Sequence, residues 1–179
     1  MSIFNRLLVI ILFFLFLGIF AVSSTHAHLI EAQHGTLNIV DDGAFMVLSL
    51  PVSAFDNLDG NSDGKVSFKE FNMRHAYIED VVKSQVLLHD AHGLRQLEGT
   101  IVTAVVGHDK KEDVIDQITV LGRFKLRTPD SPLNFIVGLF GEAEPEKKFM
   151  ISAQRQVDGR SVSFILKPDA SSRVLFPPL

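Results

Sequence analysis

From Ser84 to its end, the chain is a series of short runs rich in β-branched and aromatic residues, separated by turn-forming residues. The runs are QVLLH, LEGTIVTAVVG, DQITVLGRFKL, NFIVGLFG, KKFMISAQRQV, RSVSFILKP and RVLF. The segment Val157-Asp158-Gly159-Arg160 is typical of a tight turn between two of them. Short strands at this spacing are typical of a sandwich or a barrel. We therefore predict a mainly β protein, specifically an antiparallel β-sandwich.

A hairpin and a helical insertion precede this series. The runs TLNIV and AFMVLSL flank Asp41-Asp42-Gly43, which indicates a β-hairpin. After Pro51, PVSAFDNL predicts a short helix, and after a polar loop VSFKEFNMRHAYIEDVVKSQ predicts a longer one. We expect this helix-loop-helix insertion at about residues 51–83, between the second and third of about nine strands. The longer helix places these apolar residues largely on one side: Phe68, Phe71, Met73, Tyr77, Val81 and Val82.

Residues 1–27 are predicted to be a secretory signal peptide. Leu7–Val22 is an uninterrupted apolar run, with Arg6 before it and the small-residue segment SSTHA after it, which is the order of a signal peptide. Cleavage after Ala27 would leave residues 28–179 as a single β-sandwich domain. Cleavage after Ser24, or retention of the run as a membrane anchor, are the alternatives. The run is shorter than the ~20 residues that span a bilayer, so we expect cleavage and no membrane span in the mature chain.

Composition narrows the compartment and the class of function. The chain has no cysteine, which excludes thiol catalysis and thiolate metal sites. An exported chain without cysteine fits a bacterial periplasm or culture medium better than a small secreted eukaryotic domain, which usually relies on disulfides. A net charge of −4 argues against a nucleic-acid-binding protein. No pattern of nucleophile, base and acid stands out, so we do not expect an enzyme.

The polar loop of the insertion carries oxygen-bearing side chains at alternating positions. It reads DGNSDGKVSFKE from Asp59 to Glu70 and resembles the calcium loop of the EF-hand family, with a resemblance that covers about residues 50–83. Calcium is a hard cation that takes six to eight oxygen ligands at about 2.3–2.6 Å, so a short loop must wrap around it. Gly64 stands at the sixth position, where the bend is sharp and a Cβ would be strained.

The resemblance implies that six positions of this loop bind one calcium ion. The ligands in chain order are Asp59, Asn61 and Asp63 through their side chains, Lys65 through its backbone carbonyl, Ser67 through a bridging water, and Glu70 through both carboxylate oxygens.

EF-hand loops usually work in pairs, and this chain shows one. The segment Asp109-Lys110-Lys111-Glu112-Asp113 begins with similar charges, but Val114 stands where glycine is required. Val66, at the eighth position, would pair its backbone with a neighbouring loop, so a second molecule or a nearby strand has to supply that partner. We therefore expect a constitutively filled site rather than a sensor, with a dissociation constant of about 10⁻⁴–10⁻³ M.

The alternative metal is copper, bound by histidine. Cleavage after Ala27 would give His28 both an α-amine and an imidazole, and copper favours such nitrogen ligands. The start HAHLIEA is similar to that of periplasmic copper-resistance β-sandwich proteins, and His34 or another histidine would be the second ligand. His89 and His92 are expected to flank a hairpin turn rather than to form a metal clip.

Taken together, these features predict an exported calcium-binding protein with a structural or binding role. A copper or other transition-metal protein is the second hypothesis, and an enzyme that uses calcium structurally is the third. A protein partner in the periplasm could dock on the apolar residues of the insertion. Packing of Phe55, Phe71 and Tyr77 into the core is the favoured interpretation, because a short amphipathic insertion needs a surface to pack on.

Overall fold

Ten strands, one α-helix and two 3₁₀ helices form the part of the chain that the computed structural model describes, residues 32–106 and 114–177. The strands are β1 (His34–Val40), β2 (Gly43–Pro51), β3 (Val86–Asp90), β4 (Gly93–Arg95), β5 (Leu97–Val106), β6 (Ile115–Lys125), β7 (Leu133–Val137), β8 (Phe149–Arg155), β9 (Arg160–Leu166) and β10 (Ser172–Leu175). The helices are η1 (Val52–Ala54), α2 (Phe68–Gln85) and η2 (Glu144–Lys147). Within these ranges, no helix is both long and apolar enough to cross a membrane. The predicted signal peptide lies outside the described residues.

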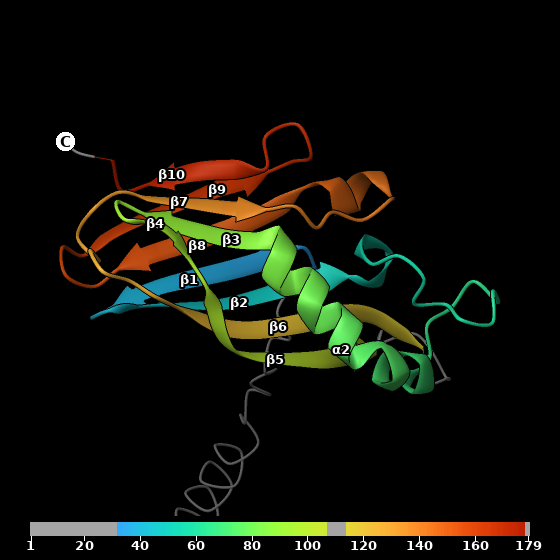
Figure 1. Cartoon of the computed structure of the whole chain (residues 1–179). Helices are drawn as coiled ribbons and strands as arrows, with labels where there is room; N and C mark the ends of the chain where they lie inside the picture. Colours follow the sequence, from blue (N-terminus) through green and yellow to red (C-terminus); the bar gives the residue numbers. More distant parts are fainter. Residues whose placement is uncertain (1–31, 107–113, 178–179) are drawn as a thin grey trace, which may run out of the picture.

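The strands form two sheets that lie one over the other (Figure 1). The larger sheet has the order β5-β6-β2-β1-β8-β9, and the smaller one has the order β10-β7-β3-β4. Alternating residues of both sheets point into one shared core, which includes Leu37, Leu48, Val120, Phe135 and Phe149. The prediction of a mainly β protein is therefore confirmed, and the arrangement is two-layered.

One strand pair departs from the predicted antiparallel pattern. β1 pairs in parallel with β8, so that His34 lies opposite Met150 and Ile39 opposite Arg155. The other strand pairs among the described residues are antiparallel. Tight hairpins force neighbouring strands to be antiparallel, but β1 and β8 are joined through most of the chain, so no turn fixes their relative direction. The larger sheet is consequently mixed, and the prediction of a wholly antiparallel sheet was wrong.

The predicted turns are confirmed where Asp and Gly occur. β1 and β2 meet in a hairpin that pairs Val40 with Gly43, and Asp41 adopts a φ of 50° there. Gly93 follows the predicted turn between β3 and β4 with a φ of 102°, and Gly159 occupies the turn before β9 with a φ of 66°. These left-handed conformations are the ones that glycine and aspartate tolerate best.

The insertion between β2 and β3 contains one helix instead of two. The predicted first helix is only the three-residue η1, and the following chain passes through Asn57 at a φ of 58°. β2 continues to Pro51, and the buried side chains of Phe55 and Leu58 hold the segment against the core. Because this short segment is anchored by its buried side chains, the chain completes a single 3₁₀ turn and then turns again at Asn57 before the loop. The prediction of a helix-loop-helix was therefore wrong in its first helix and right in its second.

α2 contacts β3 of the smaller sheet and β5 of the larger one, so it spans both layers (Figure 1). Its buried residues are Phe71, Ile78 and Val82, which follow a helical period. Phe68 is 38% exposed, Met73 74% and Tyr77 36%, so the predicted one-sided grouping of the apolar residues was wrong for these three. The packing interpretation is confirmed for Phe55 and Phe71, which belong to the core, and was wrong for Tyr77, which does not.

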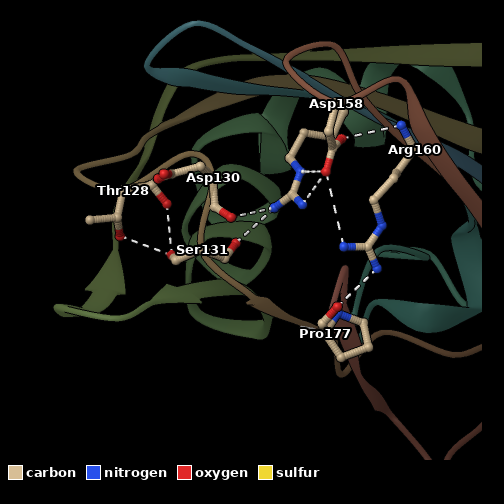
Figure 2. Close-up of polar contacts among 7 residues, drawn as sticks. Thr128, Asp130, Ser131, Asp158, Arg160 and Pro177 are labelled. Atoms are coloured by element: carbon tan, nitrogen blue, oxygen red, sulfur yellow. Dashed lines mark hydrogen bonds and ion pairs between the residues drawn. The ribbon is translucent and has the colours of Figure 1, made fainter. Parts of the chain in front are cut away.

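A buried arginine, Arg155, ties the turn after β8 to two distant segments, and Figure 2 shows its partners Asp130, Ser131 and Asp158. Arg155 is 3% exposed and donates from Nε and Nη2 to Oδ2 of Asp158. Its Nη1 donates to the backbone carbonyls of Asp130, at 2.9 Å, and Ser131, at 3.1 Å. The guanidinium lies 4.6 Å from the ring centroid of Phe176. Because the guanidinium is paired and hydrogen-bonded, this buried charge acts as a structural clamp.

We predict that Arg155→Ala lowers the free energy of unfolding by about 3 kcal/mol, because two backbone carbonyls and Oδ2 of Asp158 lose the hydrogen bonds from its guanidinium. Arg155→Lys should recover only part of this loss, since an ammonium cannot reproduce the planar fork. Urea denaturation measures both. Arg173→Ala, in the exposed part of β10, is the matched control and should change stability by less than about 0.5 kcal/mol. Equal stability of the Arg155→Ala and Arg173→Ala variants would contradict the clamp.

Candidate metal centre

The candidate calcium loop protrudes at one end of the two sheets, between η1 and α2 (Figure 1). Residues 60–65 are exposed to solvent, whereas Val66 at the end of this stretch is buried. The six predicted ligand residues all lie on this one loop and the first turn of α2. The loop is therefore open to ions from solution and anchored at its end.

The first half of the loop is curled by hydrogen bonds from its own backbone. Asp59 accepts from the amide of Gly64 at 2.8 Å and from that of Asp63 at 3.2 Å. Asn61 Oδ1 also accepts from the amide of Asp63, at 2.9 Å, and Asp63 Oδ1 accepts from that of Lys65, at 2.9 Å. Gly64 has a φ of 78°, so the sharp bend predicted at the sixth position is confirmed. The side-chain oxygens thus line the inner side of a tight turn.

Glu70 joins the two ends of the loop. Its Oε1 accepts from the amides of Gly60, at 2.9 Å, and Asn61, at 3.3 Å. Its Oε2 accepts from the amide of Ser67, at 2.9 Å, and from the Ser67 hydroxyl, at 2.8 Å. The Ser67 hydroxyl in turn accepts from the amide of Glu70, which completes a capping box at the start of α2. One carboxylate therefore caps the helix and closes the loop.

These hydrogen bonds perturb the acidity of Glu70. The Ser67 amide is the largest cause and the Ser67 hydroxyl the next, and together they lower the pKa of Glu70 below its ordinary value. A carboxylate whose pKa is lowered by folding contributes stability above its unfolded pKa and loses it as the pH falls through the folded value. Glu70 is therefore held as an anion at neutral pH, which is the state that binds a cation.

The donor set fits a hard cation in its chemistry. Asp59, Asp63 and Glu70 supply carboxylates, Asn61 supplies an amide oxygen and Ser67 supplies a hydroxyl, and oxygen ligands of this kind suit calcium. In the described ranges, no three His, Asp or Glu side chains converge closely enough to hold a metal ion. The carboxylates are instead turned toward backbone amides. To bind an ion, these carboxylates would therefore have to exchange some of their hydrogen bonds with backbone amides for contacts with the ion.

The backbone partner of Val66 is a strand of the larger sheet. The carbonyl of Val66 accepts from the amide of Ile115 at 2.8 Å, and Ser67 forms an antiparallel bridge with Val114. The position of Val66 in the loop predicts a backbone partner from a second molecule or from a nearby strand, and the structure shows the strand. Val114 and Ile115 lie almost fifty residues downstream, so no local pattern could have identified them.

The histidines lie partly outside and partly inside the described residues. His28 lies outside the described residues, as does the rejected loop Asp109–Asp113. His34 has its Nδ1 2.8 Å from the carbonyl of Ala32. His75 packs edge-on against Phe71, with ring centroids 5.7 Å apart.

The segment from His89 to His92 forms the predicted hairpin turn. Its buried carboxylate, Asp90, accepts hydrogen bonds from the amides of His92 and Arg127. This carboxylate therefore stabilises the turn, as the hairpin interpretation of the two histidines implies.

Comparison with known proteins does not identify a function, so the geometry of the loop is the basis for assigning one. No protein-family model matches the chain, and no characterised protein matches it with significant similarity.

We predict that Ser67→Ala destabilises the protein by about 1 kcal/mol, because it removes the helix cap of α2, and that it raises the pKa of Glu70 toward its ordinary value. Urea denaturation gives the first quantity, and an NMR titration of the Glu70 carboxyl gives the second. Ser84→Ala is the control, since its hydroxyl donates to the carbonyl of Val81 at the far end of α2. A Glu70 pKa that is the same in both variants would show that the Ser67 hydroxyl does not contribute to the shift, which would then be due to backbone amides.

Proposed function

We propose that this chain is an exported calcium-binding protein that holds one ion in the loop from Asp59 to Glu70. The observation that carries the proposal is the closed loop itself. Its turn is made by Gly64 in a left-handed conformation, and its last residue, Glu70, accepts hydrogen bonds from the amides of Gly60 and Asn61 near its start. The predicted ligand residues are thereby gathered on one short, curled segment, as binding of a calcium ion requires.

The ligand chemistry favours calcium over other metals. The candidate ligands are oxygen atoms, and three of the residues carry a formal negative charge at neutral pH. Transition metals prefer nitrogen or sulfur ligands, which the loop from Asp59 to Glu70 does not offer through its side chains. Calcium tolerates a flexible oxygen shell better than magnesium, which demands near-octahedral geometry.

The role that fits this site is structural. η1 is only three residues long, and the segment before the loop is anchored by the buried Phe55 and Leu58. An ion bound by Asp59 and Glu70 would fasten this segment to the first turn of α2. The bound ion would therefore stabilise the docking of α2 on the two sheets. Export, which we infer from the apolar run Leu7–Val22, would place the protein in a periplasm or outside the cell.

We predict that the chain from His28 onward, after treatment with a chelator, binds one calcium ion with a dissociation constant of about 10⁻³ M or lower, and that Glu70→Gln weakens this binding at least tenfold. Glutamine can still form the capping box, so this variant removes charge while it preserves the helix start. Isothermal titration calorimetry measures the affinity, and thermal unfolding with and without calcium measures the stabilisation.

Glu79→Gln is the matched control, because Glu79 lies on the same helix but pairs with Lys83 at 2.6 Å, away from the loop. It should bind calcium like the parent. Equal affinity in the parent and the Glu70→Gln variant would show that the assigned ligands are wrong. The lack of any heat or thermal stabilisation at several millimolar calcium would overturn the proposed function itself.

A further inference from the structure

The edge of β6 that pairs with β2 extends past the end of β2. β2 pairs with β6 from Gly43, opposite Lys125, to Pro51, opposite Gln117. Beyond this point the chain leaves the sheet through η1 and the loop, and it returns at Val66 and Ser67. There Val66 accepts from the amide of Ile115, and Ser67 bridges to Val114. The end of the candidate calcium loop thus continues the position of β2 along the same edge of β6.

We propose that β6 takes the place of the second loop of an EF-hand pair, so that calcium binding and the pairing of Val66 with Ile115 are thermodynamically linked within one chain. This inference rests on the proposed function and adds to it the partner of the loop. The partner belongs to the same chain, so a second copy is not needed to complete the site.

Burial shields the contact between Val66 and Ile115 from water. Val66 and Val114 are each 7% exposed and Ile115 is 1% exposed, so water does not compete for their backbone groups. An amide at such a position has to find a partner within the protein, because an unpaired buried donor is costly. The carbonyl of Val66 is that partner.

The same contact reaches the proposed ligands through one residue. Ser67 follows Val66 directly, and its amide donates to Oε2 of Glu70 at 2.9 Å. The peptide unit between Val66 and Ser67 therefore offers its carbonyl to β6 and its amide to the proposed calcium ligand. A change in the position of Glu70 would therefore move this peptide unit, and a loss of the hydrogen bond to β6 would free the peptide unit to move. Linkage requires that each event alters the other by the same factor.

The first test is amide hydrogen exchange in the parent protein, measured by NMR with and without saturating calcium. We expect exchange of the Ile115 amide to slow at least fivefold when calcium is bound. The amide of Phe135 in β7 of the smaller sheet is the internal control and should slow less. The Glu70→Gln variant, at the same calcium concentration, should show no slowing at Ile115.

The second test uses a matched pair of variants. Ile115→Pro and Ile115→Ala both remove the buried side chain, but only proline removes the N–H donor. We expect calcium to bind about fivefold more weakly to the proline variant than to the alanine variant, as the loss of one hydrogen bond implies. If the proline variant does not fold, the exchange experiment alone decides.

The outcomes separate the two proposals. Calcium binding in calorimetry, with unchanged exchange at Ile115, would overturn the linkage and leave the calcium site standing. A calcium-dependent dimer in size-exclusion chromatography would also overturn it, because the loop would then be paired with a second copy. The lack of any calcium binding would overturn both proposals.

Discussion

The open edge of β6 is the constraint on which the position of the insertion depends. β2 ends at Pro51, opposite Gln117, and proline cannot donate to a further strand ladder. The buried amide of Ile115 nevertheless needs an acceptor. The insertion meets this need by returning to the sheet at Val66, after a loop that contains Gly64 at its bend. The location of the loop thus follows from the hydrogen-bonding requirement of a strand, before any ion is considered.

Electrostatics explains why the same loop is suited to a cation. Asp59, Asp63 and Glu70 place three negative charges on one short segment, and like charges at this spacing repel each other. Backbone amides compensate in part, with Glu70 accepting from three amides and the Ser67 hydroxyl. A divalent cation would offset the charge far more than these dipoles do. Hydrogen bonds therefore hold the loop in its present arrangement, and a bound cation would replace some of them.

Sequence analysis predicts the local features well, because they depend on nearby residues. The alternation of apolar residues predicts the strands, Asp and Gly predict the hairpin turns, and the spacing of the loop residues predicts the bend at Gly64. Arg155 could also have been found, since it continues the inward-facing series of Ile151 and Ala153 in β8. A charged residue at such a position needs an internal partner.

The features that escape prediction depend on residues far apart in the chain. The parallel pairing of β1 with β8 has no local signal, because no turn joins the two strands. The missing first helix depends on the burial of Phe55 and Leu58 against a core that is formed mainly by other segments. The partner of Val66 depends on the relative lengths of β2 and β6.

The anchoring of the loop also decides what an ion can do there. Ions act as switches where their binding moves a helix pair between two arrangements and exposes a new surface. Here the segment before the loop contains only a single 3₁₀ turn and is held by buried side chains, and the segment after it pairs with β6 through Val66. Neither side of the loop is a free helix that could swing. A ligand shifts an equilibrium only by its differential affinity for the two states. At this loop the two states are α2 docked on the sheets and α2 undocked from them. The free energy of calcium binding would therefore appear as stability of the α2 docking rather than as a change in the exposed surface.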